Sequence, residues 1–206
     1  MKFRFLILGT VFLLFFFGFT LIVKTHALVG FDFNTTVRIQ NHIPKSLDTV
    51  MSFFSLLGSV EILSIALLII LIFHRKLLAF VSLLFFFFAQ FVEIIGKSFL
   101  YHPGPPFRFF RYNLPFLFPS SYVQPGSSYP SGHSLRIVFV ALVFAYILQK
   151  SKRLPPATKT LLQFLIVAFT IIMLVTRVSL GEHWSTDVIG GSLLGIGFGL
   201  FSLIFL

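Results

Sequence analysis

The sequence has no cysteine and few acidic residues, with six Asp and Glu against sixteen Lys and Arg in 206 residues. Without cysteine, neither disulfide bonds nor thiolate metal ligands can contribute to the fold or to its chemistry. Charged residues make up only 11% of the chain, whereas 57% of it is hydrophobic. This composition excludes an ordinary soluble domain and is typical of a helical bundle embedded in a membrane.

The net charge of +10 does not indicate a nucleic-acid partner. The basic residues are scattered between apolar stretches and do not gather on one amphipathic surface, as nucleic-acid binding would require. We therefore expect no nucleic acid and favour anionic lipid as the partner.

Six apolar stretches approach the roughly 20 residues that a membrane-spanning helix needs. They lie at about residues 5–23, 51–73, 77–100, 132–149, 160–177 and 187–206. The sequence thus predicts an all-α polytopic membrane protein, with one domain over residues 1–206 and six transmembrane helices in a bundle. The first stretch is long for the apolar part of a secretory signal, so we interpret it as an anchor, with cleavage after Ala27 as the alternative.

The short loops give an orientation. Residues 74–76 and 150–159 carry Lys and Arg but no acidic residue. The positive-inside rule places these loops and both chain ends in the cytoplasm, which predicts a multi-pass protein of the plasma (inner) membrane. Segment 101–130, which holds seven of the ten prolines, then lies on the extracytoplasmic side, and a loop of that length is usually functional or disordered.

Ionisable residues enter the predicted spans from the outer side only. Because neighbouring helices alternate in direction, these residues meet at one membrane face, where a charge inside a span indicates function by default. They are Glu93, Lys97, His133, Arg136, Arg177 and Asp187. A ring of side chains that reach the lipid headgroups, or ion pairs with a purely structural role, are the alternatives.

Two local patterns favour phosphate chemistry. Asp187 lies four residues after His183, so on a helix its carboxylate can bind one imidazole nitrogen and leave the other free to act as a nucleophile or base. Pro130-Ser131-Gly132-His133 opens the fourth span, and the N–H groups at the N-terminus of a helix attract an anion.

Together these blocks resemble the type 2 phosphatidic acid phosphatase superfamily. The resemblance rests on Pro130-Ser131-Gly132-His133 and on Thr176-Arg177 followed by His183 and Asp187, over residues 97–190. The family's remaining block is a Lys, six residues and Arg-Pro, but this chain has Gly104-Pro105 after Lys97. An arginine of the family pattern is therefore missing, and Thr176 replaces the usual serine.

The resemblance implies a role for each matching residue. His183 matches the nucleophile, which forms a phosphohistidine, Asp187 the carboxylate that orients it, and His133 the general acid. The residues that match phosphate ligands are Lys97, Ser131, Gly132 and Arg177. The implied function is a metal-independent membrane lipid phosphatase without a cofactor, acting on a phosphate monoester or diphosphate such as phosphatidate, phosphatidylglycerol phosphate or polyprenyl diphosphate.

The missing arginine requires a substitute, because a phosphoryl group in transfer spreads negative charge over three oxygens. Arg136, three residues after His133, is the first candidate as a further phosphate ligand. Arg108 and Arg111 are the second, and they are also candidates to bind the lipid headgroup.

Several alternatives remain open from sequence. A lipid phosphotransferase would use the same residues, and a non-catalytic lipid-binding protein with a degenerate site would explain Gly104. A metal hydrolase is disfavoured because the histidines and carboxylates lack the spacing of known ligand motifs. A hydrolase with Ser131 as nucleophile lacks the G-x-S-x-G pattern. Sequence does not determine the lipid or the oligomeric state.

Overall fold

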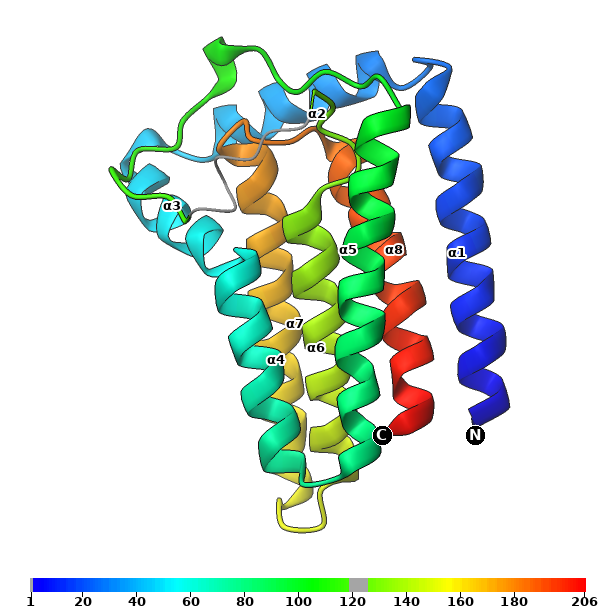
Figure 1. Cartoon of the computed structure of the whole chain (residues 1–206). Helices are drawn as coiled ribbons and strands as arrows, with labels where there is room; N and C mark the ends of the chain where they lie inside the picture. Colours follow the sequence, from blue (N-terminus) through cyan, green and yellow to red (C-terminus); the bar gives the residue numbers. More distant parts are fainter. Residues whose placement is uncertain (1, 119–125) are drawn as a thin grey trace.

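A computed structural model describes residues 2–118 and 126–206 of the chain. The described part is helical, with a bundle of long helices covered at one end by two shorter ones (Figure 1). The bundle consists of α1 (Lys2–Lys24), α4 (Val60–His74), α5 (Val81–Phe99), α6 (Gly132–Lys150), α7 (Pro156–Ser179) and α8 (Ser185–Ser202). The covering helices are α2 (Val29–His42) and α3 (Asp48–Leu57). Short 3-10 turns are η1 (Lys45–Leu47), η2 (Leu77–Phe80), η3 (Phe107–Phe109) and η5 (Leu203–Phe205).

The helices agree closely with the spans expected from sequence, with one difference. In the described part, five helices are long and apolar enough to cross a membrane, and six if one bent pair counts as a span. The bent pair falls on the expected span 51–73, which is not one straight helix. Residues 45–57 and 60–74 instead meet at an angle of 56°. The expected outer loop 101–130 lies partly outside the described residues, at 119–125.

Local chemistry explains the bend. Gly58 ends α3, and Ser59 caps α4 by accepting a hydrogen bond from the amide of Ile62 over 3.3 Å. A serine N-cap starts a new helix because its hydroxyl satisfies a backbone N–H that the first turn leaves free. A side chain at position 58 would also overlap the ring of His133. The break therefore brings the Gly58 backbone against a predicted catalytic residue.

A glycine face of α8 brings that helix close to α6. Side chains at Gly191 and Gly195 would overlap the carbonyl groups of Ser131 and Leu135, and one at Gly199 would meet Leu142. Small residues at such positions allow two helix backbones to approach within contact distance. The amide of Ser131 also donates to the carbonyl of Asp187 over 3.0 Å. The starts of α6 and α8, which carry the predicted catalytic residues, are thereby fixed to each other.

The first helix packs along the same bundle. A side chain at Gly9 of α1 would overlap the ring of Phe201, and one at Gly197 of α8 would overlap Leu13 of α1. The hydroxyl groups of Thr20 and Tyr129 lie 2.8 Å apart and join α1 to the segment before α6. Helix α1 thus packs as part of the bundle.

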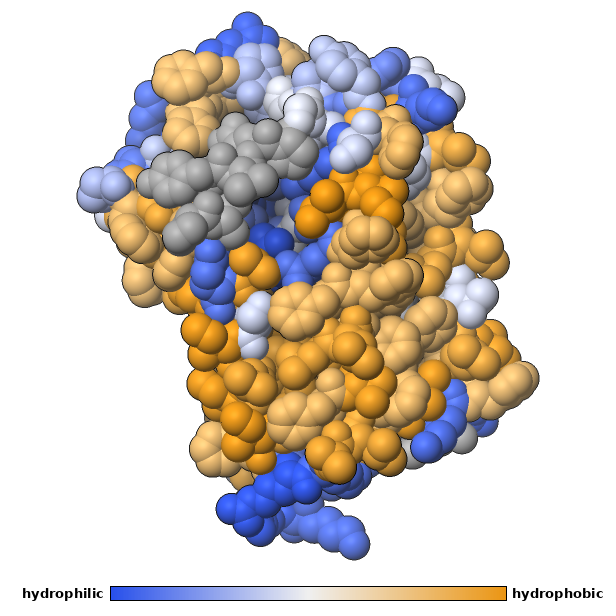
Figure 2. Space-filling model, viewed as in Figure 1, coloured by the Kyte–Doolittle hydropathy of each residue, from blue (hydrophilic) through white to orange (hydrophobic). Residues whose placement is uncertain are grey.

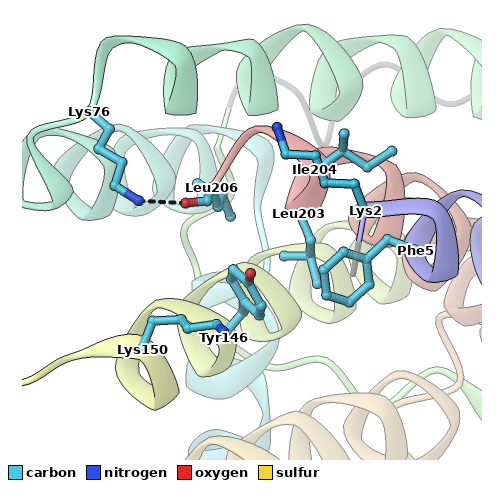
Figure 3. Close-up of a pocket in the computed structure, with 8 residues that line it drawn as sticks. All are labelled: Lys2, Phe5, Lys76, Tyr146, Lys150, Leu203, Ile204 and Leu206. Atoms are coloured by element: carbon cyan, nitrogen blue, oxygen red, sulfur yellow. Dashed lines mark hydrogen bonds between the residues drawn. The ribbon is translucent and has the colours of Figure 1, made fainter.

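The two ends of the bundle differ in charge. Figure 2 shows an apolar belt around the bundle with hydrophilic residues at both ends. All six acidic residues of the chain lie at or near the end covered by α2 and α3. The opposite end has a pocket of about 370 Å³ that is lined by Lys2, Lys76 and Lys150 with apolar neighbours (Figure 3), and Lys76 donates to the carbonyl of Leu206 over 2.7 Å. None of the predicted site residues lines that pocket.

Candidate active site

The predicted site residues meet at the end of the bundle that α2 and α3 cover. Lys97 lies near the end of α5, Ser131 to His133 lie at the start of α6, and Arg177 lies in the last turn of α7. His183 follows α7, and Asp187 lies in the first turn of α8. Figure 2 shows a hollow with hydrophilic residues near this end. The structure therefore brings together residues that lie as much as 90 positions apart in the sequence.

His183 and Asp187 form the expected pair, although not along one helix. Nδ1 of His183 lies 3.2 Å from Oδ2 of Asp187, and both side chains are buried. His183 stands in the turn before α8, while Asp187 also caps that helix by accepting from the amide of Trp184 over 2.9 Å. The hydroxyl of Ser128 donates to the same oxygen over 2.6 Å. Asp187 is thus held by the helix start and the preceding loop as well as by the histidine.

A left-handed glycine produces the turn that carries His183. Gly181 has a φ angle of +66°, and a side chain there would overlap the carbonyl of Phe109. Positive φ is readily available to glycine because it lacks a Cβ. The turn folds back onto α7, so that the amides of Glu182 and His183 both donate to the carbonyl of Arg177 over 3.1 Å. This local geometry brings the predicted nucleophile, His183, next to a predicted phosphate ligand, Arg177.

The surroundings keep the imidazole of His183 neutral. Burial lowers the pKa of His183 well below its usual range, and the positive charges of Arg177 and Lys97 lower that pKa further. In the neutral ring one nitrogen carries a proton and the other a lone pair. Because the Asp187 carboxylate accepts the hydrogen bond at Nδ1, the lone pair lies on Nε2. A nucleophilic nitrogen is therefore available at neutral pH.

Arg136 sets the tautomer of His133. Nη2 of Arg136 lies 3.3 Å from Nδ1 of His133, and its Nε donates to the carbonyl of Gly58 over 3.3 Å. A guanidinium can only donate hydrogen bonds, so Nδ1 accepts and the ring proton is on Nε2. The predicted face shared by these two residues is present, and the bend at Gly58 supplies the second partner of Arg136.

The phosphate ligands have defined partners around the start of α6. Ser131 is the N-cap of that helix, with its hydroxyl 3.4 Å from the amide of Ser134. Lys97 binds Glu93 over 2.8 Å, and Oε2 of Glu93 lies 3.8 Å from Nη1 of Arg136. A side chain at Gly132 would overlap the Glu93 carboxylate. An acidic group thus lies among the cations and against the glycine that the resemblance assigns to phosphate.

Arg177 is held from one side only. Its Nη1 donates to Glu182 over 2.7 Å and to the hydroxyl of Ser55, whereas its buried Nε has no hydrogen-bond partner among the described residues. Ser55 also donates to Glu182 over 2.8 Å. Ser55 of α3 and Glu182 therefore bind Nη1 of Arg177, and the N–H group at Nε stays available to an anion.

The two loop arginines have other partners. Arg111 binds Asp48 over 2.6 Å and donates to the carbonyls of Gln40 and Ile43. Arg108 is exposed, with its guanidinium 5.1 Å from the ring centre of Phe109. Arg111 therefore fixes the loop to the start of α3, and a headgroup role for either residue remains a prediction.

Sequence reasoning missed part of the site. It assigned no role in phosphate chemistry to His102, Asp32 or Ser128, although all three lie near Asp187. No motif or spacing signals these contacts, because they join segments far apart in the chain. Across residues 2–118 and 126–206, no three His, Asp or Glu side chains are arranged to hold one metal ion.

The chain is similar to known proteins in both sequence and structure. Phosphatidylglycerophosphatase B of Bacillus subtilis (strain 168) is 45% identical over 71 residues, which cover 34% of this chain and 34% of that protein. The alignment thus spans about a third of the relative's length.

Two solved structures are similar over most of their length. The transmembrane PAP2 type phosphatidylglycerolphosphate phosphatase from Bacillus subtilis has a TM-score of 0.75 and 26% identity, covering 95% of this chain and 93% of its own. Aquifex aeolicus LpxE has a TM-score of 0.60 and 25% identity, covering 84% of this chain and 94% of its own. The family model of the PAP2 superfamily matches residues 76–206, which include every predicted catalytic residue. The family prediction is thereby confirmed, and the chain belongs to the PAP2 superfamily.

Proposed function

We propose that this protein is an integral membrane lipid phosphatase that hydrolyses a phosphate monoester or diphosphate of a lipid through a phosphohistidine. The observation that carries the proposal is the buried pair of His183 and Asp187, 3.2 Å apart, with Nε2 of a neutral imidazole left free. Lys97, Arg177 and the start of α6 supply positive charge and N–H donors around that nitrogen. Phosphoryl transfer depends mainly on such positioning and charge neutralisation.

The reaction has two steps. Nε2 of His183 attacks phosphorus, and the bond from phosphorus to the lipid oxygen breaks while His133, whose imidazolium form the bound phosphate dianion favours, gives its Nε2 proton to that oxygen. His133, now able to accept a proton, takes one from water, and the water oxygen attacks phosphorus as the bond to His183 breaks. Free phosphate leaves, and both histidines return to their starting forms. Asp187 stabilises the positive charge that develops on His183 in the first step.

The substrate enters from the membrane. Exposed apolar side chains such as Phe15, Phe87 and Phe164 surround the bundle, so acyl or prenyl chains can stay in the bilayer while the phosphate reaches the polar end. The name of the Bacillus subtilis relative makes phosphatidylglycerol phosphate the first lipid to test. The proposed orientation, with this end outside the cytoplasm, rests on the basic loops at the other end.

Phosphate release by the purified protein in detergent tests the proposal. The panel consists of phosphatidylglycerol phosphate, phosphatidate and a polyprenyl diphosphate, each with and without EDTA, with His183→Ala as the matched control. We expect release from at least one lipid, unchanged by EDTA and absent in the variant. No release from any lipid would contradict the proposed function, and activity lost in EDTA and restored by magnesium or zinc would contradict metal independence.

A further inference from the structure

Asp187 has a second histidine on its other oxygen. Nε2 of His102 lies 3.3 Å from Oδ1 of Asp187, whereas His183 binds Oδ2. His102 is buried, with 6% of its surface exposed. Among the described residues the buried Oδ1 atom has no well-formed hydrogen bond, and the Nε2 atom of His102 is close enough to become its donor. The carboxylate is therefore placed between two imidazoles.

His102 is held firmly in this position. Its carbonyl accepts from the amide of Ser128 over 2.8 Å, and its backbone also contacts the hydroxyl of Ser127. Its ring meets the edge of Tyr129 at 6.0 Å between ring centres. Burial lowers the pKa of His102, so the ring is neutral at pH 7 and has a single N–H to offer. The nearest acceptors lie around Nε2, which places that proton on Nε2.

A second carboxylate, that of Asp32, lies near the ring of His102. Oδ2 of Asp32, from α2, lies 4.0 Å from Nε2 of His102. Asp32 accepts from the amide of Thr186 over 2.8 Å and from its hydroxyl over 2.7 Å. It thereby caps α8 one residue before Asp187. Asp32 also lies before residues 76–206, the part that the family model matches.

We propose that His102 and Asp32 are positioning residues of the catalytic pair. His102 donates its Nε2 hydrogen to Asp187 and fixes the carboxylate that orients His183, while the Asp32 charge holds the imidazole of His102 in that tautomer. This inference rests on the proposed function, since it assigns a role in the same reaction. Neither residue touches the phosphate.

Other ionisable groups also act on this cluster. They are His26 from the turn before α2, Lys97 from α5, Tyr129 from the loop before α6, and Arg177, Glu93 and Arg136 around His183. None of these groups is altered by substitution of His102 or Asp32, so they form a constant background in the comparison below.

Substitutions of Asp32 and of His102 should shift the pH at which His183 gains a proton in opposite directions. The nucleophile works as a neutral ring, so turnover is lost as the pH falls and the ring gains a proton. Burial raises the pKa of Asp32 to about 6, so its carboxylate stabilises the protonated His183 ring only above that pH. Asp32→Asn removes this charge, and the acidic limb of kcat should begin at a lower pH. His102→Phe removes a donor from Asp187, whose carboxylate then attracts the proton of His183 more strongly. The acidic limb should move to higher pH, and kcat should fall by about tenfold.

The experiment measures kcat against pH for the wild type and matched variants of the full chain in detergent. His102→Phe keeps an aromatic ring against Tyr129, and His102→Gln keeps an N–H donor and should restore part of kcat. Asp48→Asn loosens the pair with Arg111, which has no hydrogen bond or ion pair with His102, Asp32 or Asp187 among the described contacts, and it controls for a general loss of stability. Shifts of opposite sign in the two site variants, with none in the control, support the proposal. An acidic limb at the wild-type pH in both site variants, or shifts of that limb in the same direction, would overturn the proposal.

A second readout separates this inference from the proposed function. If the wild type releases no phosphate, the proposed function fails. The titration of His183 followed by NMR in protein labelled with 15N-histidine still tests the cluster. The same opposite shifts in the His183 titration are expected, and identical titrations in all proteins would overturn the inference. If His102→Phe does not fold, Asp32→Asn and His102→Gln carry the test.

Discussion

Arg136 donates from Nη2 to Nδ1 of His133 over 3.3 Å, so a buried cation fixes the ring of the proposed general acid. The same guanidinium lies 3.8 Å from Glu93 and binds the carbonyl of Gly58. Arg136 therefore contacts the same carboxylate as the predicted phosphate ligand Lys97. We predict that it meets the charge that the missing arginine at position 104 would have met.

Arg136→Gln should lower turnover by about a hundredfold or more, because it removes a charge beside the transferring phosphoryl group and frees the His133 ring. Gly104→Arg should restore part of the loss. A side chain there meets only Ser128, at 3.5 Å, so space is available. Steady-state kinetics of the single and double variants measure both effects.

Arg153→Gln is the matched control, since Arg153 is exposed in the loop between α6 and α7, at the opposite end of the bundle. Turnover of this control should stay within a few fold of the wild type. Near-normal turnover in Arg136→Gln would contradict its role, and the same substitution at Arg108 and Arg111 would then decide whether the site works with Arg177 as its one arginine.

We predict that Glu93 competes with the substrate for Lys97. The carboxylate lies 2.8 Å from the ammonium group and against Gly132, where it repels an incoming phosphate. Glu93→Gln should therefore lower KM and the inhibition constant for vanadate by about tenfold, equivalent to ~1.4 kcal/mol of binding free energy.

Glu182→Gln provides the contrast. Glu182 holds Arg177 from the side away from its free Nε, so loss of its charge should loosen that cation and raise KM. If both substitutions changed KM in the same direction, Glu93 would have no competing role.

The proposed orientation predicts a labelling pattern in intact cells. Gly126 is exposed, and a side chain there meets no atom within 4 Å, while Lys152 is exposed in the loop between α6 and α7. The chain has no cysteine of its own. Gly126→Cys should react with an impermeant thiol reagent, and Lys152→Cys should react only after the membrane is opened. The reverse pattern would invert the topology.

Local spacing made part of the site predictable. His183 with Asp187, and Lys97 with Glu93, lie four residues apart, a separation that brings side chains together on or near one helical turn. The apolar stretches likewise predicted the long helices, because a run of about 20 apolar residues is typical of a transmembrane helix.

Contacts between distant segments were not predictable in this way. Asp32 meets Thr186 across 154 positions, and Ser55 meets Arg177 across 122. Such pairs depend on how α2 and α3 fold over the end of the bundle, and no periodicity in the sequence encodes that placement. The bend at Gly58 was missed because residues 51–73 are apolar enough to read as one continuous span.

Direct detection of a phosphohistidine tests the central claim, that His183 attacks phosphorus. Purified protein is mixed briefly with the best lipid substrate, quenched in base to preserve the phosphoramidate bond, digested and analysed by mass spectrometry. We predict phosphate on His183, lost on acid treatment and absent in His183→Ala, with accumulation in His133 variants if His133 also activates the water. A fully active enzyme with His183→Ala, or a phosphoenzyme at another residue, would contradict this account.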